Sequence, residues 1–456
     1  MDDRRWLRPL GVAVTALWLS ASAGVASAHG AVGSAAAAPI PLWLLYTGAG
    51  GTVALTAVWL AVGDRTGDAG EGTAAPPSVT VPVWLARALE NVGRALGLVA
   101  LVAVLAFGVV GPQIRSANVA TVLFWPVWLK GIGLLAVVVG SPWPVVSPWE
   151  TVYRGLTRLE GAPPRLLGTY PEWLGEWPAV AGFALVVGVA ENLTTLPRSP
   201  RLTAVLVAGY ALVMLLGALA FGPAWLRRAD ALAVLYRLLG LVAPLSVGRE
   251  AGGYRVALRA PWRSCTRSVR SVSTAAFVVL ALYTVSFDGL AETTAFQSLL
   301  AATRGLAGPV PAAVALYLVG FGLFLGGYWL AVALAGRAGD EAGPTAFAAS
   351  LLPIAAAYEV AHTYPFVLRN LGRLLELSTA GLLAVDPVAG LSVSVFWGSQ
   401  VLLVVGGHLV AVAAAHAAAV RRYGVSAGRR AHAPLAVVMV GYTVCSLWII
   451  SQPLAN

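Results

Sequence analysis

The sequence predicts an all-α fold, a polytopic bundle of transmembrane helices, from three observations. Apolar residues make up 58% of the 456-residue chain, charged residues only 11%, and the mean hydropathy is +0.79. A soluble domain carries about 25% charged residues. Long apolar runs also recur along the whole chain and leave no room for a soluble domain. We therefore expect residues 29–456 to form one integral membrane domain in the lipid bilayer of the cell membrane.

The first segment, residues 1–28, is typical of a secretory signal peptide. Arginines near the start precede an apolar stretch over residues 10–25, and Ala26 and Ala28 form a small-x-small cleavage pattern. Cleavage there would leave His29 as an external N-terminus. An uncleaved signal anchor is the alternative, because the apolar stretch is close to the shortest length that spans a bilayer.

Ten later apolar stretches have the length of about 20 residues that a helix needs to cross a bilayer. They are residues 41–62, 93–111, 119–139, 178–193, 203–222, 272–288, 310–335, 346–366, 396–420 and 434–450. We expect these ten spans to follow the signal peptide.

An eleventh apolar stretch, residues 231–247, is expected to be a re-entrant or interfacial helix. It follows Asp230 and contains Arg237 and a proline. The next segment, residues 248–271, is rich in arginine, and short loops of this kind stay in the cytoplasm. Counting 231–247 as a span would place these arginines outside. The ten-span topology places them inside, with the mature N-terminus outside.

Ionisable residues within the spans are the candidates for chemistry, because a charge at the centre of a bilayer is costly. Glu359 and His362 share one helix face, with the Glu-x-x-His spacing of metal sites in helix bundles. A structural or proton-handling pair explains the same spacing. His408 lies in the next span. With the amine and imidazole of His29, these residues form a candidate external site for copper or zinc, although each can instead be an unrelated polar residue.

The other charges near the spans have structural interpretations. We expect Asp230 and Arg237 to form an interfacial pair, Glu191 to lie at the wet end of a short span, and Asp288 to lie in an external loop. The connection over residues 140–177 is rich in tryptophan and proline. It is expected along the cytoplasmic surface, with its tryptophans in an interfacial belt.

Several classes of function have no support in the sequence. The chain contains no Gly-x-Ser-x-Gly elbow, His-Glu-x-x-His, Cys-x-x-Cys or phosphate-binding glycine-rich loop, so no nucleotide cofactor is indicated. The net charge of +10 comes almost wholly from arginines between the spans, which indicate topology and not a nucleic-acid partner. Cys265 and Cys445 are expected in separate segments, without a disulfide.

Six motifs are spread over most of the chain from the mature N-terminus onward. They are His29–Gly33, Pro39–Leu44, Phe124–Trp128 (FWPVW), Ser147–Thr151 (SPWET), Val285–Gly289 (VSFDG) and Ala357–His362 (AYEVAH). Together they resemble prokaryotic multi-pass membrane proteins often labelled fenitrothion hydrolase. The resemblance implies a membrane-bound organophosphate hydrolase. Because such hydrolysis usually needs a metal-activated water, it implies the same four candidate residues.

Three functions therefore follow as hypotheses. The first is handling or transport of a copper-like metal ion through an external site. The second is a membrane-embedded, metal-dependent hydrolase of lipophilic esters, as the resemblance implies. The third is a structural subunit of a membrane complex. The sequence does not decide between an enzyme and the other two.

Overall fold

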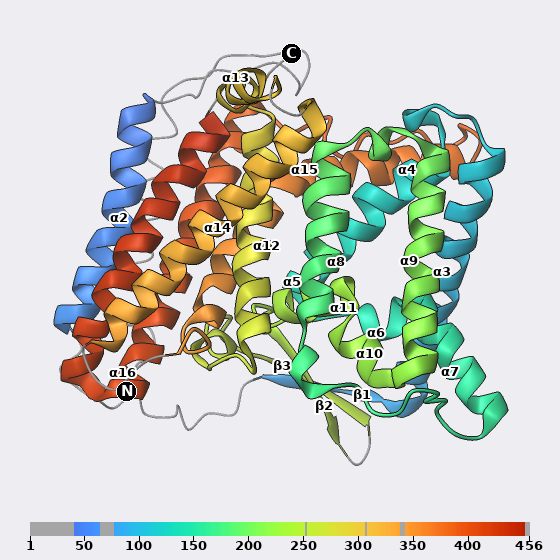
Figure 1. Ribbon diagram of the computed structural model, residues 1–456, viewed down its shortest axis with the longest axis horizontal. Coiled ribbons are helices and arrows are strands. Elements are labelled where there is room, and N and C mark those ends of the chain that lie inside the picture. The colour runs from blue at the N-terminus through green and yellow to red at the C-terminus, as the bar shows by residue number, and fades with distance from the viewer. Residues whose placement is uncertain (1–40, 64–76, 251–252, 306–307, 338–342, 452–456) are drawn as a thin grey trace.

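A computed structural model describes residues 41–63, 77–250, 253–305, 308–337 and 343–451 (Figure 1). The predicted signal peptide and His29 lie outside these residues. Within them the fold is mostly helical, and eight helical segments are long and apolar enough to cross a membrane. They are Leu42–Val62, Val83–Val110, Val119–Val139, Glu172–Glu191, Pro200–Phe221, Val272–Ala291, Pro309–Gly336 and Val393–Ile449.

Five of these segments correspond to single regular helices, and the last combines two expected spans. The single helices are α2 (Leu42–Gly63), α3 (Val83–Val110), α9 (Pro200–Phe221), α12 (Val272–Ala291) and α14 (Pro309–Gly336). Helix α16 (Val393–Ser451) has 59 residues and a non-helical Gly424 with φ of 76°. At about 1.5 Å per residue it is too long for one crossing. The chain folds back near Gly424 (Figure 1).

The expected span 346–366 lies on a longer and more polar helix. The short helix η8 (Ala348–Leu351) leads into α15 (Leu352–Ser378). Helix α15 carries Glu359, Arg369 and Arg373, and it is not among the eight apolar segments. The helix extends twelve residues beyond the predicted end of the span, since 366 to 378 stays helical.

Two of the crossing segments contain π-helix. The segment Val119–Val139 consists of α4 (Val119–Val122), the π-helix η3 (Leu123–Gly131) and α5 (Ile132–Val139). Pro126 lies inside η3 and has no N–H to donate, which favours a departure from regular α-helix there. The other segment ends with α8 (Trp177–Phe183) and the π-helix η5 (Ala184–Glu191). Short π-helical stretches are frequent at functional sites.

A small antiparallel sheet corrects the all-α prediction. It contains β1 (Ser78–Pro82), β2 (Leu245–Glu250) and β3 (Gly253–Leu258) in the order β1-β3-β2. Ser78 pairs with Ala257, and Leu245 pairs with Leu258. The expected helix 231–247 is therefore only half right. It forms α11 (Ala231–Leu239) and then turns into β2, since Pro244 cannot continue a helix.

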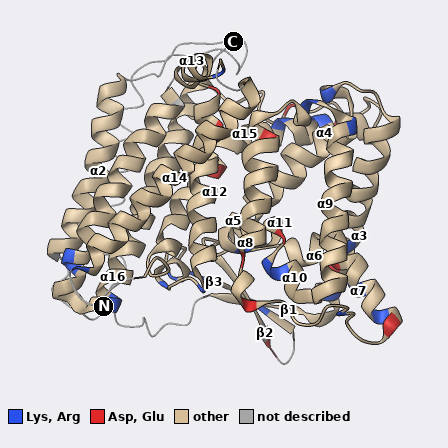
Figure 2. Ribbon diagram, in the orientation of Figure 1, with Lys and Arg blue, Asp and Glu red and all other residues tan. Residues whose placement is uncertain are grey.

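Shorter helices complete the described chain. They are η2 (Arg115–Ala117), α6 (Trp143–Val146), α7 (Pro148–Glu160), η4 (Glu172–Leu174), η6 (Leu196–Arg198), α10 (Pro223–Arg228), η7 (Ser264–Thr266) and α13 (Thr294–Thr303). The sheet, α7 and α10 lie at one end of the bundle, which we call the sheet end. Helix α13 lies at the opposite end, the α13 end (Figure 1). Most charged side chains lie toward these two ends (Figure 2).

Candidate functional site

The centre of the site is Lys130, the one lysine of the chain. It lies in η3, near the middle of the segment Val119–Val139, and its side chain is only 8% exposed. Its Nζ lies 3.5 Å from Oε1 of Glu191, 3.7 Å from Oε1 of Glu359 and 4.0 Å from Oδ2 of Asp288. One ammonium group is therefore surrounded by three carboxylates.

Four separate elements bring these side chains together. Lys130 comes from η3 and Glu191 is the last residue of η5, so both π-helices contribute. Asp288 lies near the end of α12, and Glu359 lies in α15. The packing of α12 against α15 is close at this level. A Cβ atom at Gly289 would lie 2.9 Å from Ile449 and 3.2 Å from the hydroxyl of Tyr358.

His362 forms the most exposed edge of the site. Its Nε2 lies 3.3 Å from Oδ2 of Asp288, and its ring stacks on Tyr358 with 6.2 Å between centroids. The side chains of His362 and Asp288 are 26% and 23% exposed, compared with 8% for Lys130. We call Lys130, Glu191, Asp288, Glu359 and His362 the Lys130 cluster. Its accessible edge is the pair of His362 and Asp288.

The charges of the Lys130 cluster do not balance. With every acid ionised and the imidazole neutral, one positive and three negative charges give a net charge of −2. Protonating His362 changes this only to −1. Buried charge that lacks a counter-charge is strongly unfavourable in a low-dielectric interior. The cluster therefore favours uptake of a proton or another cation.

Unpartnered polar atoms lie at the same place. Among the described residues, Oε2 of Glu191, the hydroxyl of Tyr358 and Nδ2 of Asn192 are buried without a hydrogen-bond partner. Most buried polar groups in folded proteins have a partner. The site can therefore accept hydrogen bonds at Glu191 and donate them from Tyr358 and Asn192, as a site that exchanges protons or water requires.

The four predicted metal ligands have different positions. Glu359 and His362 both belong to the Lys130 cluster, but Glu359 faces Lys130 while His362 contacts Asp288. His408 is buried, its Nδ1 lies 2.8 Å from the carbonyl of Val404, and within the described chain its Nε2 has no partner. His29 lies outside the described residues.

The arrangement around Lys130 does not resemble a metal centre. Over the described ranges, no group of three or more His, Cys, Asp or Glu residues is arranged to hold a metal ion. The ammonium of Lys130 lies among the three carboxylates, at the position that a metal ion bound by them would take. Gly407 of α16 lies against Pro353 and Ala357 of α15. His408, the next residue, therefore lies on the sheet-end side of Glu359.

Sequence reasoning missed three members of the cluster. Glu191, expected at the wet end of a span, is mostly buried beside Lys130. Asp288, expected in an external loop, contacts His362 inside the bundle. The third is Lys130, a single lysine in the middle of an apolar span. That position is a signal the sequence offers, because an intramembrane charge is a functional candidate by default.

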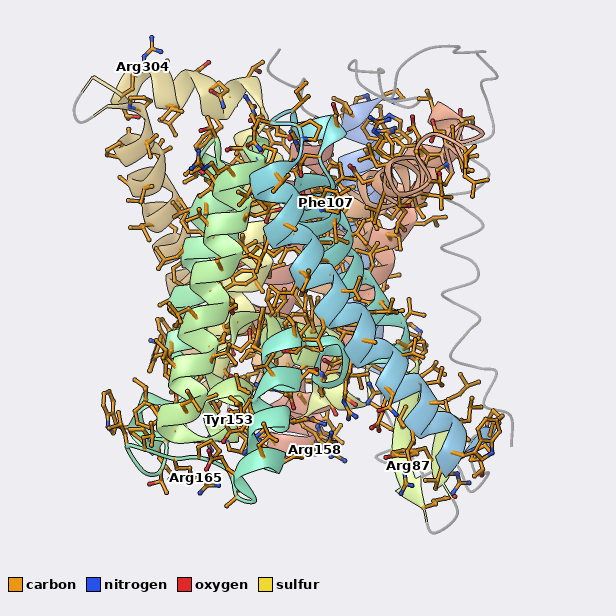
Figure 3. The ribbon with its side chains drawn as sticks, turned by 90° about the vertical axis from the view of Figure 1, so that its right-hand side faces the viewer. Arg87, Phe107, Tyr153, Arg158, Arg165 and Arg304 are labelled. Atoms are coloured by element: carbon orange, nitrogen blue, oxygen red, sulfur yellow. The ribbon has the colours of Figure 1, made fainter. Side chains whose placement is uncertain are left out.

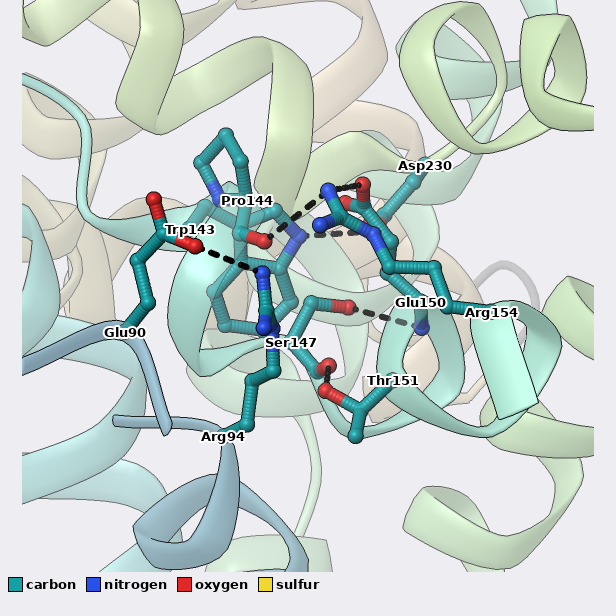
Figure 4. A network of polar contacts seen from close by, with 9 residues as sticks. All are labelled: Glu90, Arg94, Trp143, Pro144, Ser147, Glu150, Thr151, Arg154 and Asp230. Atoms are coloured by element: carbon teal, nitrogen blue, oxygen red, sulfur yellow. Dashed lines mark hydrogen bonds and ion pairs between the residues drawn. The ribbon is translucent and has the colours of Figure 1, made fainter. Parts of the chain in front are cut away.

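A second buried carboxylate lies at the sheet end and has a complete set of neutral donors. Oδ2 of Asp230 accepts hydrogen bonds from Nε1 of Trp143 at 2.9 Å and Nε1 of Trp149 at 2.7 Å. Oδ1 accepts from the hydroxyl of Tyr210 at 2.8 Å and the backbone N–H of Leu232 at 2.9 Å. Figure 4 shows the hydrogen bond from Trp143 to Asp230. We call this the Asp230 network.

The Asp230 network corrects two expectations. Asp230 does not pair with Arg237, which instead forms an ion pair with Glu176. Trp143 and Trp149 are buried and do not lie in an interfacial belt. Burial raises the pKa of Asp230, and the four hydrogen bonds oppose this rise.

The chain matches no family model, no curated protein and no solved structure. The function is therefore inferred from the geometry of the site.

Proposed function

We propose that this multi-pass membrane protein takes up and releases protons at the Lys130 cluster, as part of proton-coupled transport across the membrane. The observation that carries the proposal is one buried ammonium among three carboxylates. Ionisable residues at membrane depth commonly mark ion pathways and proton relays. The negative excess of the cluster gives a proton a place to bind, and the exposed edge at His362 gives it a way in.

A proton fits the cluster better than a metal ion. A proton needs one lone pair, and Oε2 of Glu191 has none of its hydrogen-bonding capacity used within the described structure. A metal ion needs several ligands at once, and Lys130 already lies between the carboxylates that would supply them. His362 can bind a proton on its imidazole and pass it to Asp288, because its Nε2 lies 3.3 Å from Oδ2 of Asp288. We assign it the role of the entry group, with Asp288 as its acceptor.

The same proposal includes an orientation. The sheet end carries a larger group of arginines, which favours the cytoplasm. This group comprises Arg227 and Arg228 of α10, Arg255 of β3, Arg259, Arg263, Arg267 and Arg270 between β3 and α12, and Arg421, Arg422, Arg429 and Arg430 of α16 near Gly424. The α13 end would then be external. Helix α2 begins at the same end, because Tyr46 lies near its start and bonds through its hydroxyl to Ser451, the last residue of α16.

Handling of a copper-like ion is the second candidate. It is favoured by one observation, that α2 starts at the α13 end, where the preceding His29 would share the external side with His362. Hydrolysis of a lipophilic ester and a purely structural role remain hypotheses, with no group in the described chain that favours either.

Infrared difference spectroscopy of the purified protein tests the proton-binding site. Stepping the pH in reconstituted membranes should change the C=O stretch of a protonated carboxyl group, and Glu191→Gln should remove most of that change. Glu376→Gln is the matched control, because Glu376 pairs with Arg373 at 2.6 Å on the more exposed part of α15. Equal spectra for Glu191→Gln and the wild type, with both folded, would overturn the proposal.

A further inference from the structure

A second polar site lies at the sheet end, away from the Lys130 cluster. A cleft of about 360 Å³ opens between α7, the loop that follows it and α10. Its lining includes Glu150, Arg154, Arg158 and Arg227. We call it the arginine cleft. Its size falls in the range of ligand sites, which is about 300–1,000 Å³.

The arginine cleft has an excess of positive charge that the protein does not neutralise. Arg154 forms an ion pair with Glu150 at 2.5 Å. In the described part of the chain, the guanidinium groups of Arg158 and Arg227 form no ion pair. Three arginines and one glutamate leave a net charge of +2. Guanidinium groups bind phosphate oxygens in a bidentate manner.

The walls of the cleft are held in place by contacts on both sides. The side chain of Ser147 caps α7 by accepting a hydrogen bond from the backbone of Glu150 (Figure 4). The hydroxyl of Tyr153 donates to the carbonyl of Pro164 at 3.1 Å, which ties α7 to the following loop. Trp149, in the first turn of α7, donates to Asp230. The cleft is thus a preformed site connected to the buried Asp230 network.

The depth and surroundings of the cleft match the edge of a bilayer. Helix α9 ends at Phe221, and α10, which lines the cleft, begins two residues later. Figure 3 shows Tyr153, Arg158 and Arg165 at the sheet end. Leu159, Leu166 and Leu167 lie in the adjoining chain and are 86%, 78% and 72% exposed. Exposed leucines beside unpaired arginines suit acyl chains next to a charged headgroup.

We propose that the arginine cleft binds the phosphate of an anionic phospholipid from the surrounding leaflet. A phosphodiester between Arg158 and Arg227 would lower the excess charge from +2 to +1. The acyl chains would lie against the exposed leucines. Basic pockets at the membrane edge bind anionic headgroups in this way. A soluble phosphate ester shares the headgroup chemistry but leaves the leucines uncovered.

Native mass spectrometry of the full protein in detergent, titrated with phosphatidylglycerol or phosphatidylcholine, tests this proposal. The double variant Arg158→Gln/Arg227→Gln should bind phosphatidylglycerol about tenfold more weakly, because it loses charge-assisted hydrogen bonds. Phosphatidylcholine has the same phosphodiester but also a cationic choline, which the positive cleft repels, so its binding should change less than that of phosphatidylglycerol. The matched control is Arg201→Gln/Arg304→Gln, which removes two exposed arginines away from the cleft. Arg201 lies in the first turn of α9, and Arg304 lies at the α13 end (Figure 3).

Three results would overturn the proposal. One is equal affinity of the cleft variant and the wild type for phosphatidylglycerol, with both unfolding at the same temperature. Another is binding of glycerol 3-phosphate as tight as that of phosphatidylglycerol, which would assign the cleft to a soluble phosphate ester. Weaker binding in the control variant, equal to that in the cleft variant, would mean non-specific charge attraction and would also exclude a site.

Discussion

The Asp230 network and the Lys130 cluster both bury carboxylates, but they differ in how far the negative charge is compensated. Asp230 is one carboxylate with four neutral donors, all from groups that do not titrate near neutral pH. The Lys130 cluster has three carboxylates for one ammonium and one imidazole. A buried charge with all its hydrogen bonds made stabilises one structure. Buried charges that are not compensated favour binding of a proton or another cation. Asp230 therefore has the features of a structural group, whereas the Lys130 cluster has those expected of the site to which we assign proton binding.

The largest expected effect on stability comes from Asp230→Ala. This change leaves the two tryptophan N–H groups and the hydroxyl of Tyr210 buried without their acceptor. Each buried neutral donor left without an acceptor costs about 1–3 kcal/mol of unfolding free energy, and these costs add over the three side chains. The midpoint of thermal unfolding in detergent should fall accordingly. Glu160→Ala, an exposed acid at the end of α7, is the control and should change little. A loss for Asp230→Ala as small as the control's would contradict the structural role.

A smaller effect on stability, with a distinct pH dependence, is expected for Lys130→Met. The variant leaves three carboxylates without the ammonium, and uptake of protons can relieve part of that repulsion. Its stability deficit relative to the wild type should therefore shrink as the pH falls from about 8 to about 5, because protonation removes uncompensated negative charge.

Unfolding midpoints measured over this range check the Lys130→Met prediction, with Asp230→Ala as the comparison. Asp230→Ala removes an acid and leaves only neutral donors, so its deficit should vary less with pH. A stability deficit of Lys130→Met that stays constant over this pH range would mean that Lys130 has a structural role like that of Asp230. The two sites would then not differ.

The smallest expected effect is on the rate of maleimide labelling of Cys265, in η7 at the sheet end. Burial raises the pKa of this thiol to about 12, so maleimide labelling near neutral pH should be slow and should speed up as the pH rises. Arg259 connects η7 to α11, because its guanidinium donates to the carbonyls of Gly240 and Ala243 and to the hydroxyl of Ser264.

Labelling of Cys265 therefore reports on the helix that Asp230 caps. Asp230→Ala should speed labelling by a few fold through loosening of α11, and Lys130→Met should leave the rate unchanged. A Cys445→Ser background removes the second thiol, so that labelling reports on Cys265 alone. Equal acceleration in both variants would mean that the two sites are not separate in stability.

The sequence predicted the bundle well because hydropathy is a local property. Nine of the ten expected spans overlap the eight apolar segments, because α16 combines two of them. The tenth, 346–366, lies largely on the more polar helix α15. The sequence predicted the shared face of Glu359 and His362 from their spacing alone. It did not predict their partners, since Lys130, Glu191 and Asp288 meet them only through packing of separate helices. The sheet was missed for the same reason, as β1 and β3 lie far apart in the chain.

The pairing of β1 with β3 has a consequence for the order in which the protein is made. Ser78 is synthesised well before its partner Ala257, and α3, which follows β1 directly, is inserted in the meantime. At about 5–20 residues per second, the ribosome needs roughly 10–35 s to cover that interval. Throughout this delay β1 has no strand beside it. The sheet therefore forms late, after translation has passed β3. It then joins the first helices to the middle of the chain.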